Sequence, residues 1–227
     1  MTPKFLDEDK LENPTPRTPV VLCVDTSSSM QPLIDELNRG IQMFVDEVRT
    51  DDVAKYSVEL AIVAFGARVE QICDFQTLEQ PLTIRELVAS GPTPMGSAIS
   101  YALELLERRK GWYKQTGIDY FQPWFVLLTD GQPTDTQDVF STACLQVHQL
   151  EQANKLSVFA VGIGPQVSFD ALRQLSTVRP PAALKDYNFR AMFQWFAKST
   201  QRVSKSTPGS DVDFDLKGLA GWAKGTV

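Results

Sequence analysis

Small oxygen-bearing side chains occur at three places far apart in the sequence, and each could contribute to one binding site. They are Asp25, Ser27, Ser29, Thr93 and Asp130. Hydroxyl and carboxylate oxygens without a neighbouring Cys or His ligand suit magnesium, calcium or manganese better than zinc, because hard cations favour oxygen ligands. Brought together, these residues would hold one divalent metal ion. Because the set has only two carboxylates, the ion would stay electrophilic and attract an acidic group from another molecule.

The positions of the two carboxylates explain how such distant residues could meet. Asp25 follows the apolar run 20–24, and Asp130 follows the run 124–128. The ligand crevice of an open α/β sheet lies at the carboxyl ends of its strands, so both side chains would reach the same edge. Two carboxylates there repel each other, and repulsion or burial favours protonation unless a cation neutralises them. The sequence therefore predicts a cation between them.

The hydroxyl groups fit the same site. Ser27 and Ser29 stand at alternate positions, so a loop leaving the strand can point both hydroxyls toward the ion that Asp25 binds. Thr93 lies among two glycines and two prolines in the segment 91–96, where a small conformational change would bring it to the ion or withdraw it. Taken singly, these residues are also typical of a helix cap, a loop and a turn. Their occurrence together favours the metal site.

The elements that would position these residues can be read from the apolar pattern. Continuous apolar runs are typical of buried parallel strands and occur at 20–24, 124–128 and 158–163. The segment 57–65 is rich in Val, Ile and Ala, and a weaker strand signal occurs at 182–185. Helical spacing of apolar residues predicts helices at 33–48, 82–88, 99–111, 139–152, 169–175 and 189–203. An alternating segment at 69–75 predicts a hairpin and one antiparallel edge strand. Together these signals predict an α/β fold, with a doubly wound, mostly parallel central sheet and helices on both faces.

Length and composition predict one domain with a flanking segment at each end. The chain has 227 residues, of which 43% are apolar, and this is enough for one substantial core. Residues 1–17 carry prolines among charges and are expected to be a flexible lead-in to a domain over residues 18–204. Residues 205–227 are rich in Ser, Gly, Asp and Lys around isolated apolar residues. We expect this C-terminal tail to be flexible alone, to dock on a partner or to fold back on the core.

The charge of the chain favours a protein as its partner. With 22 basic and 28 acidic residues the formal net charge is -6, which disfavours nucleic acid and anionic membrane. The first twenty residues lack the apolar core of a secretory signal, and no apolar run reaches membrane-spanning length. We therefore expect a soluble, cytoplasmic protein. Cys23, Cys73 and Cys144 lack metal-ligand spacing and are expected to be buried, reduced thiols.

Taken together and in order, the fragments at the site resemble a known family. The fragments are Val-Asp25-Thr-Ser27-Ser-Ser29-Met, Gly91-Pro-Thr93-Pro-Met-Gly96 and Leu-Thr-Asp130-Gly. They are similar to the metal-ion-dependent adhesion site (MIDAS) of von Willebrand factor type A (VWA) domains, and the resemblance covers about residues 18–204. It implies a Rossmann-like, doubly wound sheet that carries Mg²⁺ at its upper edge. Ca²⁺ or Mn²⁺ would also suit oxygen ligands.

The resemblance also implies roles and partners. Ser27, Ser29 and Thr93 would be direct or switchable ligands, while Asp25 and Asp130 would act directly or through water. The family uses this site to bind protein partners, often through an Asp or Glu carboxylate of the partner. Within the VWA family, the compact single-domain form and the sequence Thr93-Pro94-Met95-Gly96 are similar to the bacterial tellurite-resistance-associated TerY-type subgroup. That similarity implies a non-enzymatic scaffold or adaptor in a stress-response signalling system, beside a protein phosphatase and a protein kinase.

Other functions would use some of the same residues. A metal-dependent phosphohydrolase would use the cation to polarise phosphate and activate water. A haloacid-dehalogenase-type phosphatase, however, has a second acidic residue where this chain has Ser27, and the one histidine, His148, falls within a helical stretch remote from any nucleophile loop. Asp135 and Asp138 would either enlarge the acidic rim or be first-turn charges of the next helix. In a further hypothesis the C-terminal tail recognises the partner and the metal only steadies the loops.

Overall fold

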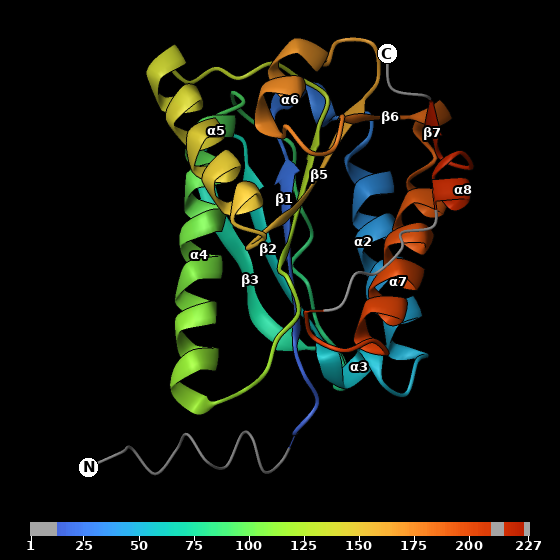
Figure 1. The fold of residues 1–227 in the computed structure, drawn as a ribbon. Coiled ribbons are helices and arrows are strands. Elements are labelled where there is room, and N and C mark those ends of the chain that lie inside the picture. Colours follow the sequence, from blue (N-terminus) through green and yellow to red (C-terminus); the bar gives the residue numbers. More distant parts are fainter. Residues whose placement is uncertain (1–12, 210–215, 225–227) are drawn as a thin grey trace.

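A mostly parallel sheet with helices on both faces forms the centre of the protein (Figure 1). The structure, a computed structural model, describes residues 13–209 and 216–224. Within these residues the sheet has seven strands in the order β3-β2-β1-β4-β5-β6-β7. The strands are β1 (Thr18–Asp25), β2 (Val58–Phe65), β3 (Val69–Thr77), β4 (Trp124–Thr129), β5 (Ser157–Ile163), β6 (Ala182–Leu184) and β7 (Ala223–Lys224). This arrangement confirms the predicted α/β fold.

The helices divide between the two faces of the sheet, as Figure 1 shows, with α2 and α7 on one face and α4, α5 and α6 on the other. The α-helices are α2 (Ile34–Arg49), α3 (Ala54–Ser57), α4 (Met95–Thr116), α5 (Gln137–Gln152), α6 (Phe169–Leu175), α7 (Phe189–Ser204) and α8 (Leu216–Leu219). Two 3-10 turns, η1 (Ser28–Met30) and η2 (Lys185–Tyr187), follow β1 and β6. None of the helices in the described part of the chain has the length and apolar character that a membrane span needs.

The central strand β1 explains why its sequence is continuously apolar. Val20, Leu22 and Val24 belong to the core under α2 and α7, whereas Val21 and Cys23 belong to the core under α4 and α5. Successive side chains of a strand point to opposite faces, so a strand covered on both faces needs an apolar residue at every position. The three cysteines are free and buried, as predicted.

The helix predicted at 82–88 is not present, and this prediction was wrong. The segment has no regular secondary structure, and Asn38 on α2 pairs with its backbone. The Leu87 amide donates to Asn38 Oδ1 at 3.0 Å, and Asn38 Nδ2 donates to the Leu87 carbonyl at 3.0 Å. Leu82 and Ile84 both pack against the core as alternate residues. The side-chain amide therefore replaces the backbone bonds of a helix, and the apolar residues follow the spacing of an extended chain.

The sheet has an antiparallel strand at each edge. Strand β3 pairs with β2, as predicted for one edge, and β7 pairs with β6 at the other. Strand β7 belongs to the predicted tail 205–227, of which residues 210–215 and 225–227 lie outside the described residues. Trp222 is 2% exposed, and its ring lies 5.7 Å from that of Trp195 and 6.0 Å from that of Phe196 on α7. The part of the tail around Trp222 therefore folds back on the core.

The amino-terminal part of the domain begins before the predicted boundary at residue 18. Residues 1–12 of the predicted lead-in 1–17 lie outside the described residues. Arg17, however, is 3% exposed and donates from Nε to Glu59 Oε1 at 3.1 Å. Its backbone amide also bonds to the Asp119 carbonyl at 2.9 Å. An ion pair and a backbone bond thus hold Arg17 against the domain.

Candidate metal centre

Four of the five residues predicted to bind a metal meet where β1 and β4 end. These strands are parallel neighbours in the sheet, so their carboxyl ends bring Asp25 and Asp130 to the same edge. The Ser29 hydroxyl donates to Asp130 Oδ1 at 2.8 Å, although 101 positions separate the two residues. Ser27 Oγ lies 3.1 Å from Ser29 Oγ. The fold thus brings two distant sequence segments into one cluster of oxygen atoms.

Thr93, the fifth predicted residue, lies at the same edge. A Cβ atom placed on Gly131 would lie 3.3 Å from Thr93 Oγ1 and 3.8 Å from Asp25 Oδ2, so both oxygens face the space beside this glycine. Thr93 is 6% exposed. The absence of a side chain at Gly131 leaves room between the threonine and the aspartate, and a larger residue there would crowd both oxygens.

Asp25 is the most deeply buried carboxylate of the centre, with no exposed surface. Its Oδ1 accepts a bond from the Ser27 amide at 2.8 Å, and its Oδ2 accepts a bond from the Thr129 hydroxyl. Burial raises the pKa of Asp25, and the charge of Asp130 raises it further, while the bonds from Ser27 and Thr129 lower it. Burial therefore makes the ionised form unfavourable unless a positive charge is nearby.

Burial also disfavours the ionised form of Asp130, which is 7% exposed. Burial raises the pKa of Asp130, and the hydrogen bond from Ser29 lowers it. A divalent cation between Asp25 and Asp130 would offset the desolvation of both carboxylates. The described residues contain no cluster of three or more His, Cys, Asp or Glu side chains that could hold a metal. The donors at this edge instead combine two carboxylates with three hydroxyls, a set that fits a hard cation.

Backbone hydrogen bonds between loops fix the orientation of the oxygen atoms. The Ser28 amide donates to the Gly91 carbonyl at 3.0 Å, and the Ser90 amide donates to the Thr26 carbonyl at 2.7 Å. Gly91 has a φ of 79°, and a Cβ there would lie 2.4 Å from the Cα of Ala67. Only glycine fits this position, because the backbone is left-handed and the neighbouring chain is too close for a side chain. The loop after β1 and the loop that carries Thr93 are therefore joined directly.

Three residues of the centre were missed or misread in the sequence. Thr129 bonds to Asp25, and the Thr93 amide donates to Thr134 Oγ1 at 3.1 Å. Asp135 accepts bonds from the Gly96 amide at 2.7 Å and from the Ser97 hydroxyl at 2.7 Å. The prediction of a first-turn charge of α5 is wrong for Asp135, which lies before α5 and caps the start of α4, and is confirmed for Asp138; the acidic-rim role stays a prediction. The position of Asp135 in the loop after Asp130 indicated that it lies near the centre. Only the fold shows that the helix it caps is α4.

The one histidine lies outside this centre. His148 is on α5, and its Nε2 lies 2.8 Å from the Gln174 carbonyl oxygen. This contact joins α5 to α6. The histidine therefore has a bonding partner in the neighbouring helix rather than in the oxygen cluster.

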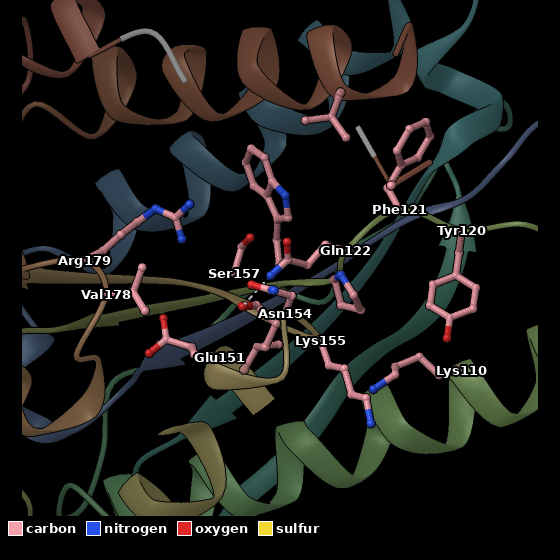
Figure 2. Close-up of a pocket in the computed structure, with 15 residues that line it drawn as sticks. Lys110, Tyr120, Phe121, Gln122, Glu151, Asn154, Lys155, Ser157, Val178 and Arg179 are labelled. Carbon is pink, nitrogen blue, oxygen red and sulfur yellow. Dashed lines mark hydrogen bonds between the residues drawn. The ribbon is translucent and has the colours of Figure 1, made fainter. Parts of the chain in front are cut away.

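A separate cavity of about 640 Å³ lies at the opposite end of the sheet, where β4 and β5 begin (Figure 2). Lys110, Lys155 and Arg179 line it together with Glu151, and Figure 2 shows the two lysines reaching toward the same corner. Glu151 is 4% exposed; its Oε1 accepts a bond from Ser176, but its Oε2 has no hydrogen-bond partner. Burial raises the pKa of Glu151. This cavity shares no residue with the oxygen cluster.

Comparison of the sequence with known families gives one result that spans most of the domain. The von Willebrand factor type A domain family matches residues 20–195. No curated protein matches the sequence.

Solved structures with the same fold include metal-loaded proteins. A von Willebrand factor type A protein from Catenulispora acidiphila has a TM-score of 0.64 and 16% identity, over 82% of this chain and 43% of that one. Proximal thread matrix protein 1 from the mussel byssus, with a zinc-occupied MIDAS motif, has a TM-score of 0.55 and 19% identity, over 82% of this chain and 48% of that one. The manganese-loaded TRAP protein of Plasmodium vivax has a TM-score of 0.54 and 18% identity, over 78% of this chain and 71% of that one.

These similarities establish a common fold. The present chain spans less than half of the length of the Catenulispora and mussel proteins.

Proposed function

This chain belongs to the von Willebrand factor type A domain family, and on that premise we propose that it is a divalent-metal-dependent protein-binding module. The observation that carries the proposal is the meeting of two buried carboxylates with three hydroxyls at one edge of the sheet. Asp25, Ser27, Ser29, Thr93 and Asp130 are the proposed metal-binding residues. Mg²⁺ is the proposed ion, because hydroxyl and carboxylate oxygens suit hard cations.

The partner would supply an Asp or Glu carboxylate. Ser29 is exposed at the edge of the centre, whereas Asp25 has no exposed surface, so an incoming group would approach from the side of the serine. An ion held by two carboxylates and neutral hydroxyls has no excess negative charge around it and attracts a further carboxylate. The zinc and manganese in two proteins of the same fold support a divalent ion in general.

A more specific role rests on the resemblance alone. We place the protein in the cytoplasm as a non-enzymatic scaffold in a stress-response system of the tellurite-resistance type. Its partners there would include a protein phosphatase and a protein kinase. Affinity purification from the native host, with and without chelator, would identify the partners and test this context.

The metal site itself is tested with the purified protein. Titration calorimetry with MgCl₂ should show one binding event in the native chain and none in Asp25→Ala. Because Asp25 makes two buried hydrogen bonds, circular dichroism must first show that the variant is folded. Partner capture that is unchanged by both EDTA and Asp25→Ala would overturn the proposal.

A phosphatase screen tests the enzymatic alternative. The proposed binding module should show no turnover of phosphate esters with Mg²⁺ or Mn²⁺. Turnover in the native chain that disappears in Asp130→Ala would instead establish a phosphohydrolase that uses the same cation.

A further inference from the structure

A second cavity, of about 440 Å³, lies directly beside the candidate metal centre. Its lining residues include Thr26 and Ser90 together with Arg68, Glu70 and Arg85. Thr26 immediately precedes the serines of the metal centre, and the Ser90 amide donates to the Thr26 carbonyl at 2.7 Å. The cavity and the metal centre therefore share the same pair of hydrogen-bonded loops.

Two arginines of this cavity converge on one carboxylate. Arg68 Nη2 lies 3.1 Å from Glu70 Oε2, and Arg85 Nη2 lies 2.8 Å from Glu70 Oε1. Their side chains are 72% and 58% exposed. A guanidinium has five N–H donors in a planar fork, so the one ion pair that each arginine makes here leaves further donors for another ligand. Glu70 thus holds the two guanidinium groups near each other, and their remaining donors can bind another carboxylate.

Two other residues define what would bind. Glu86 also lines the cavity, so the formal charges of the two arginines and the two glutamates cancel. Binding of an acidic group would therefore depend on hydrogen bonds from the guanidinium groups and not on net charge. The negative charge of Glu86 would weaken this binding. Val88 is 72% exposed in the same loop, and Ile72 lines the cavity. A segment that carries an acidic residue beside an apolar one would meet complementary groups on this surface.

From this arrangement we propose that Arg68 and Arg85 bind a second carboxylate of the same acidic protein segment whose first carboxylate completes the metal centre. The inference rests on the proposed function, because the metal provides the first anchor. It deepens that function by assigning the partner a segment with two acidic residues and an apolar residue near the second. Linking two weak contacts in one segment raises affinity because the second contact forms intramolecularly.

The test uses fluorescein-labelled synthetic peptides of glycine and serine. One peptide carries a single aspartate, and a set carries two aspartates separated by one to four residues. Fluorescence anisotropy with MgCl₂ should show that the best two-aspartate peptide binds about tenfold more tightly than the single-aspartate peptide. Arg68→Gln and Arg85→Gln should remove most of this gain and leave binding of the single-aspartate peptide unchanged.

Two controls make the result specific. Arg39→Gln changes another exposed arginine, which pairs with Glu36 on α2, and should preserve the gain. Glu86→Gln should increase the gain, because it removes a negative charge from the cavity. The gain should also decrease with added NaCl, as expected for exposed charges.

The outcomes separate the two proposals. Metal-dependent binding of the single-aspartate peptide, without a gain from the second aspartate or with a gain that survives both arginine substitutions, would overturn this inference and leave the metal-site function standing. No magnesium-dependent binding of any peptide would overturn carboxylate binding at the metal centre, and this inference with it.

Discussion

The Ser29 hydroxyl donates to Asp130 Oδ1 at 2.8 Å, and this bond joins the loop after β1 to the end of β4. A hydroxyl can donate its hydrogen to a carboxylate while its oxygen lone pairs face a cation. The bond is therefore compatible with direct metal binding by Ser29 and an indirect role of Asp130. It gives the serine an orientation that a free loop residue would lack.

Ser29→Ala should weaken Mg²⁺ binding by about tenfold while the fold stays intact. The substitution removes one proposed ligand and the donor to Asp130, but the side chain is exposed, so little packing is lost. Titration calorimetry measures the affinity. Ser28→Ala is the matched control, since Ser28 is also exposed and its contact with Gly91 uses only backbone atoms. Equal affinities of the two variants would contradict a ligand role for Ser29.

Thr129→Val should also weaken Mg²⁺ binding, by roughly three- to tenfold, because Asp25 loses a hydrogen bond worth about 1 kcal/mol. Valine keeps the shape of threonine, so the effect reports the hydroxyl. The control is Thr200→Val on α7, where the buried hydroxyl bonds only to the Ala197 carbonyl of its own helix. A similar loss of metal affinity in the control would show a general packing effect instead.

Asp135→Asn should lower stability and Mg²⁺ affinity together. Asp135 fixes the first turn of α4, which begins two residues after Thr93, through bonds to Gly96 and Ser97. Loss of a helix-capping carboxylate costs about 1 kcal/mol, so thermal unfolding should occur a few degrees lower. Asp138→Asn, an exposed change in the first turn of α5, serves as the control. Asp135 is excluded as a positioning residue if its variant loses stability but binds Mg²⁺ normally.

Glu151→Gln should stabilise the protein more at pH 8 than at pH 4. Burial raises the pKa of Glu151 in the folded state above its ordinary value. The folded state therefore favours the protonated carboxyl of Glu151. The contribution of this carboxyl to the free energy of unfolding is complete at low pH and is lost as the pH rises through the raised pKa. Glutamine stays uncharged and avoids this loss. Urea unfolding at both pH values measures the difference, and the exposed Glu104→Gln is the charge-removal control.

Trp222→Ala should destabilise the domain by about 3 kcal/mol, a typical value for truncating a buried tryptophan. The ring packs against Trp195 and Phe196 on α7, and the Trp222 carbonyl accepts a bond from the Lys185 amide at 2.7 Å. Chemical unfolding followed by circular dichroism measures the loss. Lys224→Gln, an exposed change in β7, the strand that follows Trp222, should have little effect.

Partner binding by Trp222→Ala and by a truncated chain together decide whether the tail recognises the partner. Truncation after Lys205 removes β7 together with Trp222, so a loss of partner binding could come from a damaged core. If truncation abolishes binding, metal affinity persists and Trp222→Ala still binds, recognition resides in the tail. An unchanged stability of Trp222→Ala would mean that the contact with α7 is weak.

The sequence alone was sufficient to predict strands β1 to β6 and the five residues at the edge of the sheet, but it did not predict strand β7. Strands β1 and β4 are buried on both faces, so their apolar runs are continuous and end at Asp25 and Asp130. The carboxyl ends of parallel strands meet at one edge, so the position of these residues followed from local pattern and a general rule of sheet geometry. Whether they bind a metal stays a prediction, and the titrations above test it.

Other features depended on contacts that no local pattern contains. The segment 82–88 is not helical and pairs its backbone with Asn38, Asp135 caps a helix that precedes it in the sequence, and Trp222 is buried against α7. Apolar spacing fixes which face of an element is buried, but an exposed polar or isolated aromatic residue is compatible with many partners. The choice among those partners is made by packing and hydrogen bonding between distant segments, and these exist only once the chain has folded.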